Sequence, residues 1–244
     1  MNEIAIIIPS RLDAKRLPNK PLKLINDKEM ILHVHEVACN ANIGEVYVAT
    51  PDQEVFDLIK KNGGKASLTS KKHLTGTDRV YEVFKKDLKK NSKIIINLQG
   101  DMPNIKSESI KNLANYMKKN LCDIATLGSD LNKKEEENNP NVVKLITEQD
   151  IKKINFSNAL DFYRISKNMV NYNIFHHIGI YAFTSKALIR YVSLERSKLE
   201  LERKLEQLRA LENGMKIHSG YVNYSPLSVD TEEDLIKVRK IMKK

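Results

Sequence analysis

A dense group of cationic side chains follows the first apolar run of the chain. In the stretch IIIPSRLDAKRLPNK, residues 6–20, these cations are Arg11, Lys15, Arg16 and Lys20. Ligands of a parallel α/β sheet bind beyond the carboxyl ends of its strands, so this segment lies where an anion would bind. Arginine grips phosphate oxygens with a fork, and lysine offers a movable point charge. Because neither GxxxxGK[ST] nor GxGxxG is present, we expect side chains, with some backbone amides, to hold the anion. The alternative is an exposed basic loop without a ligand.

Two aspartates stand where a metal ion could be held. Asp101 ends the apolar run of INLQGDMP, residues 96–103, and Asp230 of LSVDTEEDL comes just before a predicted helix. Mg²⁺ prefers oxygen ligands and usually bridges substrate phosphates. Asp101, at the end of a strand, could equally be a helix cap or a turn residue. Together with the basic segment, however, the two carboxylates predict a metal-assisted phosphoryl-transfer site.

The elements that would position these residues alternate between strands and helices over about the first 125 residues. Apolar, β-branched runs predict strands at 3–10, 45–50, 65–70 and 93–101, and helical patterns occupy 29–41, 52–63, 77–88 and 106–120. The later part is more antiparallel in character. It has two predicted strands within 142–156 around a turn at 148–150, a strand at 176–183, a leucine-striped helix at 195–214 and a helix at 231–244. We expect an α/β fold of one domain with an inserted subdomain, and the polar loop 132–141 is the candidate boundary.

Composition excludes several classes of protein. The chain has 244 residues, 41% of them hydrophobic, which is ample for a buried core. No run is apolar and long enough for a membrane span or a secretory signal, so we expect a cytoplasmic protein. Cys39 and Cys122 lie far apart, without zinc-ligand spacing. The net charge of +10 comes mostly from scattered lysines, which is typical of solvated helix faces, and 6% aromatic residues without a reader motif argue against nucleic-acid binding.

Eight motifs in one order resemble a known family. They are IPSRLDAKRLPNKPL, VAT, HLTGTDRV, INLQGDMP, NPNVVKLI, HHIGIYAF, LELERKLEQLRALENG and SVDTEEDLIKVR, and they extend from about residue 4 to residue 240. This order is similar to that of the 3-deoxy-manno-octulosonate (KDO) cytidylyltransferases. The resemblance implies a Rossmann-like nucleotidyltransferase fold with a mostly parallel, mixed sheet and a smaller β-rich insertion. It also implies transfer of CMP from CTP to KDO, which gives CMP-KDO and diphosphate for lipopolysaccharide synthesis.

The resemblance further implies roles for individual residues. About 1–125 would bind the nucleotide, and about 126–244 would bind the sugar and form a homodimer. Nucleotide-binding residues would be Pro9, Ser10, Arg11, Arg16, Lys20, Thr75, Thr77, Asp78, Arg79 and Gln99, while Asp101 and Asp230 would hold Mg²⁺. Arg16, Lys20, Asp101 and Asp230 would form the catalytic set, and Lys15 would face solvent. Sugar-binding residues would be Arg164, His177, Tyr181, Glu206 and Gln207.

The sequence alone supports other interpretations of the sugar-binding set. Glu206 and Gln207 lie on a leucine-striped helix, where they would ordinarily be surface residues, and His177 in an apolar strand would ordinarily be a core histidine. An arginine such as Arg164 does suit a planar carboxylate.

Two departures from the family pattern leave the sugar open. QGDMP replaces the usual QGDEP, so Met102 stands in place of an acid, and LDFYR replaces LYFSR, which introduces Asp161 and Tyr163 beside Arg164. The second change lies in the sugar-binding part of the motif order, so it could signal 8-amino-KDO or another 2-keto sugar acid, with Asp161 as partner of an ammonium group. A sialic acid is a further alternative, although LEQLRALENG argues against it.

Overall fold

The computed structural model describes residues 3–14, 16–88, 91–120, 122–165 and 172–243, and the predicted solvent exposure of Lys15 lies outside these ranges. The described chain divides into two compact units. Residues 1–114 and 226–244 form the first unit, and residues 115–225 form the second. Within the described ranges, no helix is long and apolar enough to cross a lipid bilayer.

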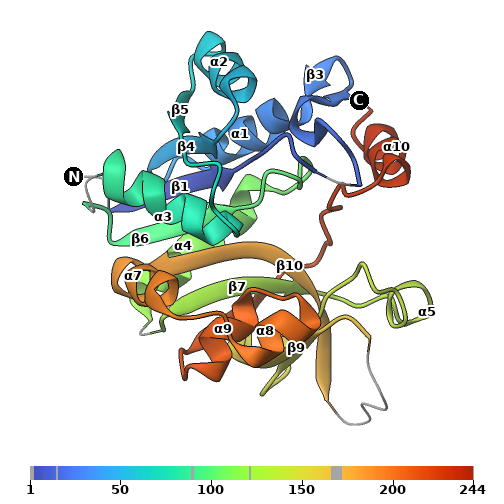
Figure 1. Ribbon diagram of the computed structural model, residues 1–244. Helices are drawn as coiled ribbons and strands as arrows, with labels where there is room; N and C mark the ends of the chain where they lie inside the picture. Colours follow the sequence, from blue (N-terminus) through green and yellow to red (C-terminus); the bar gives the residue numbers. More distant parts are fainter. Residues whose placement is uncertain (1–2, 15, 89–90, 121, 166–171, 244) are drawn as a thin grey trace. The chain divides into compact units, whose positions relative to one another are not determined.

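The part of the main sheet that lies in the first unit has four parallel strands (Figure 1). Its order is β5 (Lys65–Leu68), β4 (Glu45–Thr50), β1 (Ile4–Pro9) and β6 (Ile94–Leu98), with every pairing parallel. All six residues of β1 are buried. Continuous apolar runs of this kind are typical of parallel strands with both faces covered. The alternating pattern of the sequence is therefore confirmed for this unit.

Helices α1 (Met30–Asn40), α2 (Gln53–Lys61) and α3 (Gly76–Lys86) pack against the central strands of this sheet. Helix α4 (Ser107–Lys119) crosses residue 114, where the units divide. The chain also forms the one-turn helix η1 (Lys20–Leu22) and a small hairpin of β2 (Leu24–Ile25) and β3 (Lys28–Glu29). Helices α1 to α4 each begin and end within a few residues of the predicted helices. The sequence did not predict η1 or the β2–β3 hairpin.

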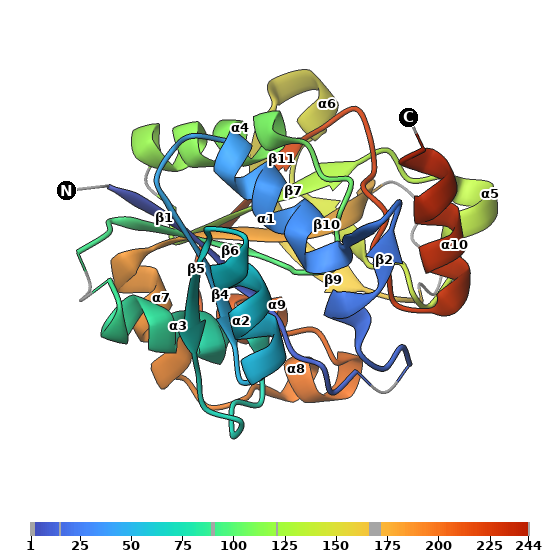
Figure 2. The same cartoon turned by 90° about the horizontal axis from the view of Figure 1, so that it is seen from above.

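Helix α10 (Glu232–Ile241) belongs to the first unit, whereas the sequence grouped residues 126–244 together. The reason is apolar contact, because six buried side chains form one cluster: Leu17, Ile25, Met30, Val229, Leu235 and Val238. Arg239 Nε donates to the Leu24 carbonyl at 2.9 Å, and Asn26 Nδ2 donates to the Met242 carbonyl at 2.8 Å. Figures 1 and 2 show α10 beside the β2–β3 hairpin from two directions.

The second unit is built around five strands whose pairings form a closed series, because the last strand also pairs with the first. The order is β10 (Asn173–Thr184), β7 (Ile124–Ser129), β11 (Ile217–Tyr221), β9 (Phe156–Tyr163) and β8 (Lys144–Thr147), and β8 also pairs with β10. Among the pairings of these five strands in the described residues, β7 with β11 is parallel and the others are antiparallel. The predicted antiparallel character is thus confirmed, while β7 and β11 were not predicted as strands. Short helices α5 (Lys133–Glu136), α6 (Ile151–Ile154) and α7 (Ser185–Ser193) lie between the strands.

The predicted leucine-striped helix over 195–214 is wrong as a single element. It is two helices, α8 (Lys198–Arg203) and α9 (Gln207–Glu212), because Lys204 adopts a left-handed conformation with φ 56° and ends α8. Leu205 and Leu208 are buried, but Leu201 is exposed. The break places Glu206 and Gln207 at the start of α9.

Candidate functional site

The basic segment after β1 is held close to the sheet by two hydrogen bonds from backbone amides. Asp52 Oδ2 accepts from the Leu12 amide at 2.8 Å, and the Ser10 amide donates to the Ala49 carbonyl at 2.9 Å. The side chains of Arg11 and Arg16 are exposed, so an anion in solution can reach them. Ser10 is buried, yet its Oγ has no hydrogen-bond partner among the described residues. A buried hydroxyl without a partner is a position where a ligand atom would be stabilising.

Lys20 lies between the two predicted metal ligands. Its Nζ is 2.9 Å from Asp101 Oδ2 and 3.1 Å from Asp230 Oδ1, and Arg16 Nη2 is 2.8 Å from Asp230 Oδ2. Burial acts to lower the pKa of Lys20, but attraction from the two carboxylates outweighs it, so the pKa lies above its ordinary value. The structure therefore brings together the four residues of the predicted catalytic set, Arg16, Lys20, Asp101 and Asp230.

The donor set at Asp101 and Asp230 fits a magnesium ion. One oxygen of each carboxylate already converges on a single cationic atom, and the two side chains are 23% and 33% exposed, which leaves access for other oxygen ligands. No cluster of three or more His, Cys, Asp or Glu that could hold a metal occurs within the described ranges. Mg²⁺ commonly takes one or two protein carboxylates and completes its shell with water and phosphate oxygens. Met102, which follows Asp101, is buried at 3% exposure.

The turn that carries Asp230 is fixed by a residue that the sequence analysis missed. Asp234 Oδ2 accepts from the amides of Asp230 and Thr231 at 3.1 and 3.0 Å, and Thr231 Oγ1 accepts from the Asp234 amide at 3.3 Å. This reciprocal pair is a capping box at the start of α10. The Val229 amide also donates to the Asp101 carbonyl at 2.9 Å, so the two carboxylate-bearing segments are joined directly.

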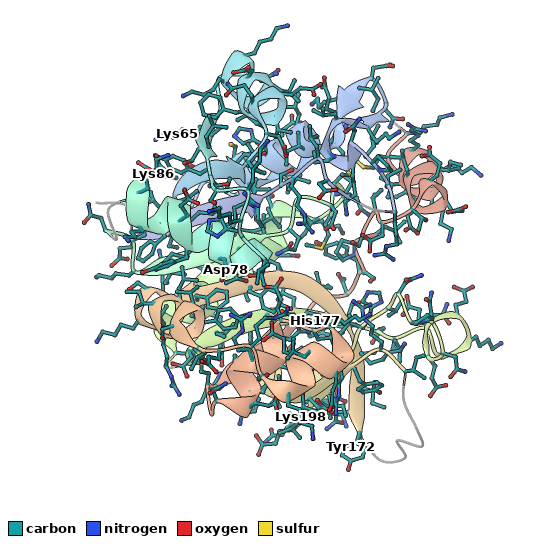
Figure 3. All side chains as sticks on the ribbon, viewed as in Figure 1. Lys65, Asp78, Lys86, Tyr172, His177 and Lys198 are labelled. Atoms are coloured by element: carbon teal, nitrogen blue, oxygen red, sulfur yellow. The ribbon has the colours of Figure 1, made fainter. Side chains whose placement is uncertain are left out.

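The start of α3 lies close to the end of β1. Thr75 caps the helix by accepting from the Asp78 amide at 3.2 Å, so α3 begins at Gly76, one residue before the predicted start at 77. A side chain at Gly76 would meet Pro9 at 3.4 Å and Gln99 at 3.7 Å, so these residues are neighbours. Figure 3 shows Asp78 in the first turn of the helix.

The buried side chain of Asn97 connects two of the nucleotide-binding candidates, Thr77 and Gln99. Asn97 Nδ2 donates to Thr77 Oγ1 at 3.2 Å, and Gln99 Nε2 donates to Asn97 Oδ1 at 3.0 Å. Arg79 is buried, and its Nη1 donates to Thr69 Oγ1 and to the Ser70 carbonyl at 2.5 and 3.1 Å. Burial, with repulsion from Arg11, lowers the pKa of Arg79. At least one nitrogen of Arg79 thus holds the loop before α3, and Asn97 is a further residue that sequence reasoning missed.

The sugar-binding candidates lie in the second unit, where four of them influence one another. The rings of His177 and Tyr181 on β10 have centroids 5.5 Å apart. Burial, followed by the charge of Glu206, raises the pKa of Tyr181, and the charge of Arg164 acts in the opposite direction. Gln207 follows Glu206 and is buried at 7% exposure, so its interpretation as a surface residue is wrong.

Thr126 holds His177, which is labelled in Figure 3, in one tautomer. Thr126 Oγ1 is 2.9 Å from His177 Nε2 and 2.8 Å from the Ile180 carbonyl. A hydroxyl has one proton, and a carbonyl can only accept, so Thr126 donates to Ile180 and accepts from Nε2–H of His177. Burial lowers the pKa of His177 to about 3, and the ring is therefore neutral at physiological pH. Its Nδ1 consequently carries a lone pair that can accept a hydrogen bond.

Replacing His177 is expected to change how stability depends on pH. Between about pH 6.5 and 3 the unfolded chain binds a proton on His177 and the folded chain does not, so folding stability falls as the pH falls. From pH 6.5 to 5 this contribution amounts to about 2 kcal/mol. Urea unfolding at pH 7.5 and 5 should show that His177→Gln loses less stability than the wild type. Equal slopes for the wild type and His177→Gln would contradict a buried neutral His177.

Asp161 already has a cationic partner within the chain. Both of its carboxylate oxygens accept from Arg203 Nη1, at 2.7 and 2.8 Å, and Tyr163 is buried at 5% exposure. An ammonium group of the sugar would have to compete with Arg203 for Asp161, which argues against the expected pairing of Asp161 with such a group. The LDFYR sequence is instead accommodated by an ion pair between β9 and α8.

The fold and the family comparison define the class to which the chain belongs. The cytidylyltransferase family model matches residues 5–217. A nucleotidyl transferase from Methanothermobacter superposes with a TM-score of 0.66 over 99% of this chain and 98% of its own at 12% identity, which shows the fold alone. The chain is a cytidylyltransferase with a nucleotidyltransferase fold, so both the predicted class and the predicted fold are confirmed.

More similar relatives define the family within that class. The 3-deoxy-manno-octulosonate cytidylyltransferase of Bartonella bacilliformis is 41% identical over 238 residues, 97% of each chain. That of Paramagnetospirillum magneticum is 40% identical over 98% of this chain and 97% of its own. The structure of CMP:2-keto-3-deoxy-manno-octonic acid synthetase complexed with CTP has a TM-score of 0.88 at 35% identity, over 98% of each chain. The chain belongs to the 3-deoxy-manno-octulosonate cytidylyltransferase family.

Proposed function

We propose that this protein transfers CMP from CTP to the anomeric hydroxyl of KDO, releasing diphosphate and giving CMP-KDO for lipopolysaccharide synthesis. The observation that carries the proposal is the convergence of Lys20 with Asp101 and Asp230 beside Arg16, in a chain about 40% identical to KDO cytidylyltransferases. A cationic segment next to a pair of carboxylates suits a magnesium nucleotide.

In this proposal the first unit binds the nucleotide. Arg11, Arg16 and Lys20 stabilise the negative charge that develops on the departing diphosphate. Asp101 and Asp230 hold Mg²⁺, which when bound supplies a Lewis acid that neutralises phosphate charge and lowers the pKa of the attacking hydroxyl. Pro9, Ser10 and Gln99 contact the nucleotide, together with the start of α3 at Thr75, Thr77, Asp78 and Arg79. No side chain needs to act as a nucleophile.

The second unit binds the sugar acid. The guanidinium of Arg164 has the shape to hold the planar carboxylate of the sugar with two hydrogen bonds. His177 Nδ1 accepts a hydrogen bond from a sugar hydroxyl, because Thr126 occupies Nε2. Tyr181 keeps its proton, since its pKa is raised by burial, and it donates. Glu206 and Gln207 offer further polar groups at the start of α9.

The direct test measures diphosphate release from CTP with different sugar acids. Purified protein is incubated with CTP, Mg²⁺ and, in separate reactions, KDO, 8-amino-KDO and a sialic acid. We expect release with KDO at a rate at least tenfold above that with either other acid. Faster release with 8-amino-KDO would favour the alternative sugar, and release with none of the acids would overturn the cytidylyltransferase function. The Asp161–Arg203 ion pair is the reason to place KDO first.

Removal of divalent cations should abolish the reaction. With excess EDTA we expect diphosphate release from CTP and KDO to fall below about one hundredth of its rate, because the divalent charge that Asp101 and Asp230 would hold against the phosphates is then missing. Added Mg²⁺ in excess of the chelator should restore the rate. Full activity in EDTA would contradict a metal role for the two aspartates.

We also propose that the protein acts as a homodimer joined through the second unit and works in the cytoplasm, where CTP is found. Sedimentation equilibrium of the intact protein at micromolar concentration would measure the mass directly. A mass of one 28.0 kDa chain would contradict the dimer.

A further inference from the structure

Lys144 is a cation enclosed in the interior of the second unit. It is the first residue of β8, and its exposed fraction is 0%. Its Nζ donates to three backbone carbonyls: Asn139 at 2.8 Å, Val142 at 3.1 Å and Arg164 at 2.5 Å. An ammonium group has three N–H donors and no acceptor, so Lys144 has donated all three.

These three carbonyls belong to two segments that meet around Arg164. Asn139 and Val142 lie in the loop before β8, and Arg164 follows the last residue of β9. The side chain of Arg164 rests on the same loop, because its Nη1 donates to the Pro140 carbonyl at 2.9 Å. Lys144 thus holds both the backbone of Arg164 and the loop that supports the Arg164 guanidinium.

The same short stretch also reaches the other sugar-binding candidates. The amide of His177 donates to the Val143 carbonyl at 2.9 Å. In the strand pairings Lys144 stands opposite Tyr163 of β9 and His176 of β10. A change at Lys144 therefore acts on the position of Arg164 first and on β10 second.

Burying this cation is energetically unfavourable, which argues against a packing role alone. Burial lowers the pKa of Lys144, attraction from Glu136 and Glu137 opposes the shift, and Arg164 adds to it. An apolar side chain of similar length would fill the space without desolvating a charge. What it could not do is donate hydrogen bonds to the carbonyls of Asn139, Val142 and Arg164.

We propose that Lys144 is a positioning residue for the sugar-acid site, fixing Arg164 so that its guanidinium receives the carboxylate of the sugar. This inference rests on the proposed function. It predicts that loss of the ammonium weakens the sugar interaction and leaves the nucleotide interaction unchanged, because the CTP-binding candidates all lie in the first unit.

The test compares Lys144→Met with Lys153→Met, which makes the same substitution at an exposed lysine of α6 in the same unit. We expect Lys144→Met to raise KM for KDO about tenfold to a hundredfold and to leave the Kd for CTP within about twofold, while Lys153→Met changes neither. If Lys144 acts through Arg164, adding Lys144→Met to Arg164→Ala should raise KM little further.

Three outcomes separate this inference from the proposed function. Wild-type protein that releases no diphosphate with KDO would overturn both. An active wild type whose Lys144→Met variant keeps a normal KM for KDO, or loses CTP affinity equally, would overturn the positioning role alone. If Lys144→Met does not fold, Lys144→Arg keeps a cation with several donors, and in a folded protein it should retain a KM for KDO near that of the wild type. A large loss of CTP affinity in that variant would count against the inference.

Discussion

Asp230→Asn is expected to slow CMP transfer by about a hundredfold or more while CTP still binds measurably. The substitution keeps the shape of the side chain and removes the charge that now faces Lys20 at 3.1 Å and Arg16 at 2.8 Å. It also removes one of the two proposed magnesium ligands, and weaker transition-state stabilisation lowers kcat more than it lowers ground-state affinity. Turnover is measured as diphosphate release, and CTP affinity by calorimetry.

Asp27→Asn supplies a matched control for that measurement. It removes the same charge from an exposed position of the first unit, in the turn between β2 and β3. Asp27 has φ 65°, a conformation that asparagine adopts readily, so the fold should tolerate the change. We expect wild-type turnover for this variant. Near-normal turnover of Asp230→Asn would contradict the proposed role of Asp230 as a metal ligand.

Glu200→Gln is expected to destabilise the protein by about 3 kcal/mol or more. Glu200 is fully buried, and its carboxylate accepts from Arg209 Nε and Nη2 at 2.8 and 2.7 Å. Arg209 is itself 3% exposed, so an amide at position 200 would leave a buried cation without its counter-charge. Although burial acts to raise it, the pKa of Glu200 is held below its usual range by Arg209 and Arg196. Urea unfolding at pH 7 measures the loss.

Glu202→Gln on the same helix is the control. Glu202 is 54% exposed and lies 3.9 Å from Lys198, a surface pair of the kind that contributes little. We expect its free energy of unfolding to stay within about 0.5 kcal/mol of the wild type. Equal effects of the two substitutions would mean that the buried pair contributes no more than a surface pair.

The Glu200–Arg209 pair also explains why sequence periodicity failed over residues 195–214. Leucines at helical spacing predicted one continuous helix, because periodicity records which residues are apolar and not where the backbone turns. The structure instead folds α9 back against α8 through this ion pair and the left-handed Lys204. A lysine carries no strong preference for that conformation, so nothing in the sequence marked the break.

The sequence predicted the residues of the candidate site in the first unit better than it predicted the residues that position candidate site residues in either unit. Arg11, Arg16, Lys20 and Asp101 follow apolar strands, and the rule that ligands bind at the carboxyl ends of parallel strands was sufficient to group them. Asn97, Asp234 and Lys144 were missed, because each acts through hydrogen bonds to particular atoms distant in sequence or in a local turn. Such partners become visible only when the fold brings them together.

The contribution of α10 to the first unit has a consequence for folding order. During synthesis the strands of the first unit and then the whole second unit, residues 115–225, are made before residues 226–244. The second unit is one continuous stretch, so all of its residues are available early. The first unit must wait for Val229, Leu235 and Val238 to close the cluster around Leu17, Ile25 and Met30. Since Asp230 arrives with the same segment, a ribosome-bound chain that ends before residue 226 has neither the closed core nor the second carboxylate facing Lys20.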